Sequence, residues 1–226
     1  MRLLSICMII GLVVTGCVQG DSNDEAVPEE TMITLPSAAT SGGMSVEETI
    51  QQRRSVRSYS SEEMSLSDLA QLVWAAQGIT SDRGLRAAPS AGATYPLELY
   101  VVAGNVENLE TGLYRYHPQK HSLSLVRTGD IRDALSSAAL GQQWVKDAPV
   151  NLVISGVLQR TASRYGERAL RYVHMEVGHA AENVFLQAVS LGMGSVMIGA
   201  FRDDEVKNLI GMEAGEEPYA IIPVGR

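Results

Sequence analysis

The chain has 226 residues, of which 45% are hydrophobic, and a formal net charge of −8. This length and apolar content suffice for one sizeable core, so we expect one domain and at most two. From Arg53 onward, 19 acidic residues stand against 17 basic ones without any basic stripe, which argues against nucleic-acid binding. Between Val18 and Gln52 there are seven acidic residues and no Lys or Arg, a pattern that fits a solvated tether.

Residues 1–16 have the pattern of a lipoprotein signal peptide. Met1-Arg2 gives a positive start, Leu3 to Val14 is almost entirely apolar, and Val14-Thr15-Gly16-Cys17 resembles a bacterial lipobox. Lipidation of Cys17 is favoured over a plain signal peptide with a chance cysteine, because Cys17 falls where cleavage is expected. The prediction is an extracytoplasmic lipoprotein anchored to the membrane. The only other cysteine, Cys7, lies in the removed segment, so the mature chain has no thiol for chemistry or cross-linking.

Residues 17–44 carry the cysteine and a segment rich in Asp, Glu, Ser, Thr, Gly and Pro, which predicts a disordered acidic linker. The folded domain is expected over residues 45–226. Ser45 and Glu48 have the spacing of a capping box and predict a helix from Val46 to about Arg53. Leucines at helical spacing predict a second helix, over residues 65–77, and a loop follows over residues 80–88.

The rest of the chain mixes strand and helix patterns without a regular βαβ rhythm. Strands are expected at 97–103, 112–116, 122–126, 150–157, 195–199 and 219–224. Helices are expected at 131–140, 168–191 and 203–210. The hairpin between the second and third strands implies antiparallel pairing, so we predict an α+β fold with helices packed on a largely antiparallel sheet.

The run Arg53-Arg54-Ser55-Val56-Arg57 places three guanidinium groups and a hydroxyl within five positions at the end of a predicted helix. Such a cluster suits a phosphate or carboxylate. Taken alone, a solvated or ion-paired arginine cluster explains it equally well.

Two further segments and the C-terminus join this run. Ala88-Pro89-Ser90-Ala91-Gly92-Ala93-Thr94-Tyr95-Pro96-Leu97-Glu98 leads into a strand, and Leu191 to Phe201 follows the longest helix. Their small residues allow a planar ligand to approach the backbone closely. Arg226 adds a guanidinium after the last strand.

Together these motifs resemble the FMN-dependent nitroreductase family, and within it the SagB/ThcOx-type branch, of which Ser-Ala-Gly-x-x-Tyr-Pro-Leu-Glu is characteristic. The resemblance covers residues 48–226. It implies that the FMN phosphate and ribityl oxygens are held by Arg53, Arg54, Ser55 and Arg57, with Arg226 completing the phosphate site. It also implies that the flavin is lined by Pro89, Ser90, Ala91 and Gly92 and contacted by Met197, Ile198, Gly199 and Ala200.

The same resemblance implies a nitroreductase-like fold and a homodimer with FMN at the subunit interface. The activity it implies is oxidoreduction of a small-molecule substrate: electrons pass to a nitroaromatic or quinone, or a peptide azoline is oxidised. The usual donor is NAD(P)H, but outside the cytoplasm a membrane quinol or partner protein is expected instead. The alternative is a lipid-anchored flavin- or ligand-binding protein without turnover.

No catalytic side chain is assigned by the sequence. The chain lacks a G-x-S-x-G elbow and a G-x-G-x-x-G dinucleotide motif. His174 and His179 are five residues apart on a predicted helix and therefore point apart, so no metal site is predicted. Tyr95, Tyr165 and Tyr172 could donate protons or stack on a ligand, although core packing is the simpler interpretation of each.

Overall fold

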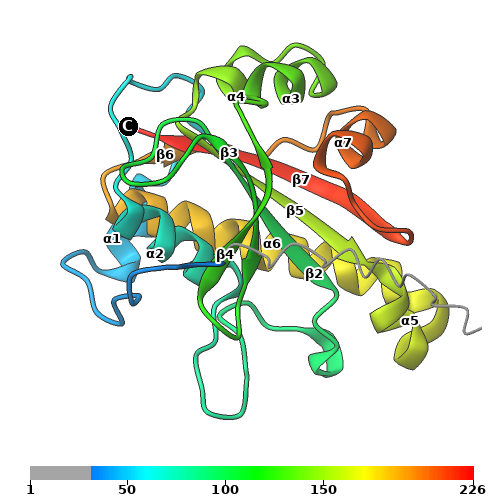
Figure 1. Ribbon diagram of the computed structural model, residues 1–226. Helices are drawn as coiled ribbons and strands as arrows, with labels where there is room; N and C mark the ends of the chain where they lie inside the picture. The colour runs from blue at the N-terminus through cyan, green and yellow to red at the C-terminus, as the bar shows by residue number, and fades with distance from the viewer. Residues whose placement is uncertain (1–31) are drawn as a thin grey trace, which may run out of the picture.

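The computed structural model describes residues 32–226 (Figure 1). The signal peptide, Cys17 and the linker as far as residue 31 lie outside the described residues. The strands are β1 (Met32–Thr34), β2 (Leu97–Ala103), β3 (Gly112–His117), β4 (Ser122–Thr128), β5 (Val150–Val157), β6 (Gly194–Ser195) and β7 (Glu216–Gly225). The α-helices are α1 (Val46–Gln52), α2 (Leu66–Gln77), α3 (Arg132–Ala138), α4 (Gln143–Asp147), α5 (Leu158–Tyr165), α6 (Ala169–Ser190) and α7 (Asp203–Ile210). Within this part of the chain, no helix is long and apolar enough to cross a membrane.

The seven strands form one antiparallel sheet in the order β1-β4-β3-β2-β5-β7-β6. The hairpin β3–β4 pairs as its sequence predicts. The α+β fold with helices on an antiparallel sheet is confirmed. β6 lies at one edge, and its two residues pair with the end of β7, where the C-terminus also lies (Figure 1).

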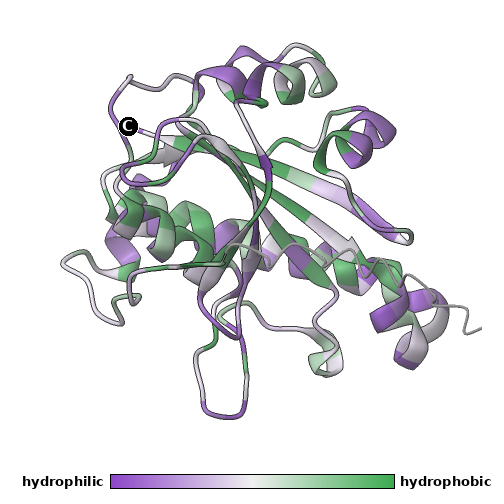
Figure 2. Ribbon diagram, viewed as in Figure 1, coloured by the Kyte–Doolittle hydropathy of each residue, from purple (hydrophilic) through white to green (hydrophobic). Residues whose placement is uncertain are grey.

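Helices cover both faces of the sheet and separate two cores. On one face α2 and α6 pack on Leu99, Val101 and Leu152. On the other face α3, α4 and α7 cover Tyr100, Val102 and Val153. This alternation along β2 follows from the period of two in a strand, with both faces buried. Figure 2 shows the resulting concentration of apolar residues along the central strands.

The local signals at several helix ends act as predicted. Ser45 Oγ accepts the N–H of Glu48, and Glu48 Oε2 accepts the N–H of Ser45, which completes the capping box of α1. Gly211 ends α7 in the left-handed conformation, with φ 74°. The longest predicted helix, 168–191, is observed as α6 at 169–190.

Three elements differ from the sequence-based expectations. Two helices, α4 and α5, were not predicted, because both are short and α5 follows β5 without a turn signal. The strand expected at 195–199 is wrong beyond Ser195. Beyond Ser195 only Ile198 pairs with β7, through an isolated antiparallel bridge to Ile221, and its side chain is buried in the second core.

The expectation of a disordered linker as far as residue 44 is wrong for residues 32–39. Met32, Ile33 and Thr34 pair with β4, and Leu35 is buried in the first core. The backbone of Ala39 is bound by the side chain of Gln71. The composition of this segment hides these contacts, because their partners lie more than 30 residues further along the chain.

Candidate functional site

The arginine run follows α1 as an extended segment beside the edge strand β6. Ser55 forms a parallel bridge with Ser195, and the N–H of Val56 donates to Ser195 O at 3.0 Å. The two segments approach so closely that a Cβ on Gly194 would lie 2.5 Å from Val56 Cβ. The run therefore extends the sheet by one short, glycine-dependent pairing.

Tyr59 fixes the far end of the run against β7. Its hydroxyl lies 2.9 Å from Val56 O and 3.1 Å from Pro223 O, and burial raises the pKa of Tyr59. The N–H of Ser60 donates to Arg226 O, so the C-terminal residue is held beside the same segment. The structure thus brings the arginine run and Arg226 together at one end of β7.

The four guanidinium groups of this cluster have weak partners within the chain. Arg53 Nε lies 3.9 Å from Glu182 Oε1, and Arg226 Nη2 donates to Asp68 Oδ2 at 2.9 Å. Arg54 Nη1 donates to the carbonyls of Gln51 and Arg53 at the end of α1. Arg57 lies over the Trp144 ring, 5.7 Å from its centroid. Exposed ion pairs of this kind contribute little to stability, so these groups can be redirected to an anion at small cost.

The segment 197–200 presents unused backbone donors next to the second core. Ile198 is buried and exchanges both backbone hydrogen bonds with Ile221. Met197, Gly199 and Ala200 are exposed, and within residues 32–226 their N–H groups have no acceptor. Ile198 thus anchors a short segment whose flanking N–H groups remain free to bind a ligand.

The segment Pro89–Gly92, by contrast, is held by α5 and α6. The N–H of Ala91 donates to Glu176 Oε1 at 2.8 Å, and Ser90 Oγ accepts the N–H of Tyr95 at 2.9 Å. Arg164 Nη1 donates to Gly92 O at 3.1 Å. Gly92 has φ 60°, and a Cβ there would lie 2.6 Å from the hydroxyl of Tyr165, so both conformation and space require glycine.

Glu176 is the least exposed acidic side chain on α6, with 3% of its surface accessible. Burial raises its pKa, while hydrogen bonds from Ala91 and Ser90 act in the opposite direction. No sequence motif includes Glu176. Its role in holding a loop 85 residues earlier has no local sequence signal.

The segment Pro89–Gly92 and the arginine run lie toward opposite ends of the sheet. Leu97, just after the segment, pairs with Gly156, which pairs with Glu217 at the start of β7. The arginine run instead lies beside the last residues of β7. Along β7, Glu217 and Gly225 are eight residues apart, which corresponds to about 26 Å between the two ends of the strand. Ala88 also packs in the α6-side core, whereas Ile198 packs in the other. One chain therefore does not bring all of its predicted cofactor-binding residues together.

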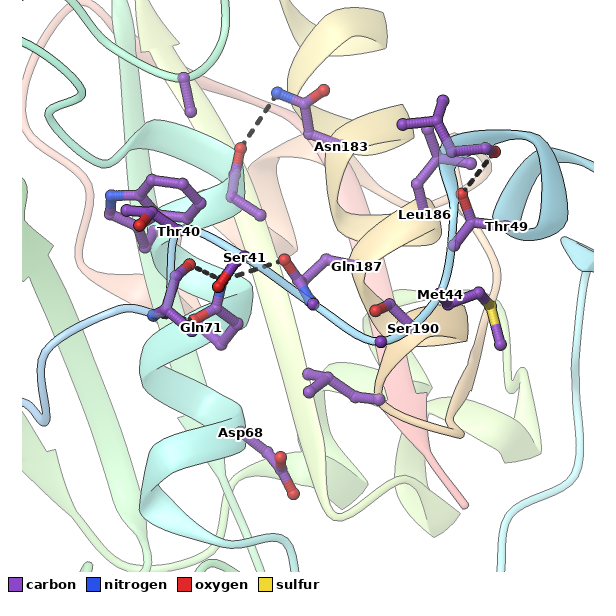
Figure 3. Close-up of a pocket in the computed structure, with 18 of the residues that line it drawn as sticks. Thr40, Ser41, Met44, Thr49, Asp68, Gln71, Asn183, Leu186, Gln187 and Ser190 are labelled. Carbon is purple, nitrogen blue, oxygen red and sulfur yellow. Dashed lines mark hydrogen bonds between the residues drawn. The ribbon is translucent and has the colours of Figure 1, made fainter.

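A separate pocket of about 660 Å³ lies where residues 37–46 cross α2 and α6 (Figure 3). Gln71 Nε2 bridges Ala39 O at 3.1 Å and Gln187 Oε1 at 3.0 Å. Asp68, which pairs with Arg226, lines the same pocket. None of the residues predicted to bind the cofactor lines it. No local sequence pattern indicates this pocket, because its lining residues come from three distant segments.

The arginine cluster lies at one edge of the sheet with free backbone donors beside it, an arrangement that suits a ligand with an anionic group. The family model of the nitroreductase family matches residues 50–226. A provisionally named nitroreductase of Methanocaldococcus jannaschii is 44% identical over 181 residues, which cover 80% of this chain and 90% of that protein. This chain therefore belongs to the nitroreductase family and is an oxidoreductase.

Solved structures agree with this assignment. A provisionally named nitroreductase from Ralstonia eutropha is similar with a TM-score of 0.76 and 31% identity, covering 86% of this chain and 89% of that one. A second from Anabaena variabilis has a TM-score of 0.78 and 29% identity, covering 94% of this chain and 45% of that one. The NADPH:FMN oxidoreductase of Vibrio harveyi shares the fold, with a TM-score of 0.58 at 21% identity, covering 80% of this chain and 68% of that one.

Proposed function

We propose that this protein is an FMN-dependent oxidoreductase that transfers electrons from a donor to a small organic acceptor. One observation carries the proposal: the arginine run, Arg226 and the free N–H groups of Met197, Gly199 and Ala200 lie on neighbouring segments around β6 and β7. At one end of this region, guanidinium groups suit the phosphate of FMN. At the other end, backbone N–H groups suit its ring.

The phosphate end is formed by Arg53, Arg54, Ser55 and Arg57, with Arg226 beside them. Ser55 is exposed, and its hydroxyl has no partner in residues 32–226. Guanidiniums bind phosphate through paired, charge-assisted hydrogen bonds, which exceed the exposed contacts they make within the chain. Asp68 holds Arg226 in place until the phosphate competes for it.

The ring end is formed by residues 197–200. When bound, FMN supplies the electron-transfer chemistry, so no side-chain nucleophile is required. Ile198 fixes the segment to β7, and the N–H groups of Gly199 and Ala200 orient the ring and favour negative charge on it. Adding a Cβ at Gly199 meets no atom within 4 Å, so the space over its backbone is open to a ring.

We infer that the functional unit is a homodimer in which the segment Pro89–Gly92 comes from the other subunit. Within one chain this segment lies toward the opposite end of the sheet from the arginine run. A two-fold axis offers a direct way to bring one subunit's segment to its partner's arginine run, twice per dimer. The resemblance to the SagB-type branch, which places FMN at the interface, supports the same arrangement.

The acceptor class follows from the family: a nitroaromatic or a quinone. Oxidation of a peptide azoline is the second candidate, favoured by the Ser90-Ala91-Gly92-x-x-Tyr95-Pro96-Leu97-Glu98 motif of the SagB-type branch. A trifolitoxin-processing protein of Rhizobium leguminosarum is 30% identical over 119 residues, which cover half of this chain and 32% of that protein. Turnover with each of the three substrates, assayed on one flavin-loaded preparation, distinguishes these acceptors.

The proposed location is the extracytoplasmic face of a membrane, with the chain anchored through lipidated Cys17. NAD(P)H is scarce there, so we propose a membrane quinol or a partner protein as the donor. Anaerobic addition of a quinol should bleach the flavin within seconds. Rapid bleaching by micromolar NADH or NADPH instead would contradict this choice of donor while leaving the flavoenzyme intact.

The alternative is a lipid-anchored flavin-binding protein without turnover. It keeps the fold and the cofactor, so bound flavin alone does not exclude it. Flavin that accepts electrons from dithionite but passes them to no nitroaromatic, quinone or oxygen would favour this alternative. Steady-state reduction of any of these acceptors would exclude it.

A further inference from the structure

A row of basic side chains follows the junction of α5 and α6, outside the cofactor site described above. Its members are Arg164, Arg168, Arg171 and His174, spaced four, three and three residues apart. All four are exposed. This density of arginine stands out in a domain whose acidic and basic residues nearly balance.

These groups lack acidic partners. Within residues 32–226, no carboxylate lies within 4 Å of the cationic atoms of Arg164, Arg168, Arg171 or His174. Arg115 and Arg132, by comparison, are both paired with carboxylates. Because no carboxylate neutralises the arginines of the row, this part of the surface keeps a local excess of positive charge.

The row borders a surface pocket of about 910 Å³. Its lining residues are Glu167, Arg168, Leu170, Arg171, His174 and Met175. Two guanidiniums outnumber one carboxylate. Leu170 and Met175 are 46% and 53% exposed beside them. This open surface, formed by one stretch of helix, thus places positive and apolar side chains next to each other.

The same stretch of chain holds the segment Pro89–Gly92. Arg164 binds Gly92 O, and Glu176, one residue beyond Met175, binds the N–H of Ala91. The pocket and the segment are therefore fixed to one rigid helical junction.

We propose that this pocket binds a small organic carboxylate with an apolar body. Guanidinium matches carboxylate geometry through two parallel hydrogen bonds, and Leu170 and Met175 cover the apolar part. A cationic ligand would be repelled by the row, and a neutral one would leave the arginines unsatisfied. That such a carboxylate is also the substrate rests on the proposed function; the binding itself does not.

Isothermal titration of the full chain with 4-nitrobenzoate and with 4-nitrobenzamide tests this site, because the two probes have similar shape and differ in charge. We expect nitrobenzoate to bind more tightly, in flavin-free and flavin-loaded protein alike. Replacing both arginines (R168Q with R171Q) should raise its Kd about tenfold and leave that of the amide within about twofold. E167Q should lower the Kd of nitrobenzoate, since it removes the only carboxylate in the pocket.

The matched control is R83Q, which removes an exposed arginine without a partner elsewhere on the domain. It should leave both dissociation constants unchanged. Equal binding of the two probes, or equal effects of R83Q and the double variant, would overturn the proposal. So would binding to phosphatidylglycerol vesicles that depends on the row while nitrobenzoate fails to bind. A protein without flavin that still binds nitrobenzoate through these arginines would contradict only the proposed function.

Discussion

At the scale of single residues, Glu176 is the buried group on which the segment Pro89–Gly92 depends most directly. It reaches the segment from the second turn of α6 and satisfies a backbone N–H that the surrounding helices do not. The backbone here is strained, because φ is positive at Gly92, Ala93 and Tyr95. Such a conformation persists only where surrounding contacts hold it.

The first prediction concerns this contact. E176A should destabilise the domain by about 1–3 kcal/mol, because it leaves the Ala91 N–H buried without an acceptor. E176Q keeps an acceptor oxygen of the same reach and should cost less. Hydrogen exchange of residues 90–95 checks this: protection should fall in E176A and largely persist in E176Q. Equal loss in both variants would contradict a hydrogen-bonding role.

A pH dependence follows from the raised pKa of Glu176. A carboxyl whose folded pKa is raised contributes stability below its unfolded pKa, and this contribution is lost as the pH rises through the folded value. The free energy of unfolding of E176Q should therefore improve relative to wild type between pH 4.5 and pH 7. Denaturant titrations at the two pH values measure this difference. If the free energy of unfolding of E176Q did not improve relative to wild type between these pH values, the pKa of Glu176 would not be raised in the folded protein.

Arg57 offers the sharpest test of the phosphate end, since within residues 32–226 its guanidinium makes only a ring contact, with Trp144. R57Q should weaken FMN binding about tenfold or more and leave riboflavin, which lacks the phosphate, almost unaffected. Fluorescence titration with both flavins measures the ratio, and R83Q is the control. Equal weakening for both flavins would place Arg57 away from the phosphate.

At the scale of elements, the critical contact is the pairing of the arginine run with β6. Gly194 lets the backbone of this edge strand approach Val56 closely. A side chain there must displace either the run or the edge strand, since the nearest atoms belong to the short, branched Val56.

We therefore expect G194A to lower the thermal midpoint by several degrees and to weaken FMN binding. G43A is the matched control, because a Cβ at Gly43 meets no atom within 4 Å and its φ is not positive. It should leave both quantities unchanged or raise stability slightly. Unchanged FMN affinity in a folded G194A protein would show that the pairing does not position the arginines.

The sequence predicted the elements whose signals are local. The capping box at Ser45, the hairpin β3–β4 and α6 follow from caps, turns and periodicity within each segment. It missed β1, whose strand character comes from pairing with β4 about 90 residues later. For the site, small residues and arginines marked the candidate segments, but the contact of Ala91 with Glu176 depends on tertiary packing that no local pattern encodes.

At the scale of the whole molecule, the separation of Pro89–Gly92 from the arginine run is the main consequence of the sheet topology. Both segments sit on rigid supports, α5 with α6 and β6 with β7, so a loop movement does not close the gap. In the homodimer that we propose, a two-fold axis would let each subunit supply the missing half of its partner's site.

Mixed dimers test this arrangement. A variant with an impaired phosphate end (R53Q with R57Q) and a variant with an impaired segment (E176A) should each have little activity alone. Co-expressed chains that pair at random should recover about a quarter of the wild-type sites, because each mixed dimer contains one intact site. No recovery, despite mixed dimers detected by differential tags, would place the complete site within one chain.

We propose above that this fold holds FMN through the arginine run. The visible spectrum of the purified full chain, with identification of the flavin released on denaturation, tests it most directly. We predict an absorption band near ~450 nm and released FMN, at about one per subunit. A colourless protein that cannot be reconstituted with FMN, or one that releases only riboflavin or FAD, would contradict the account.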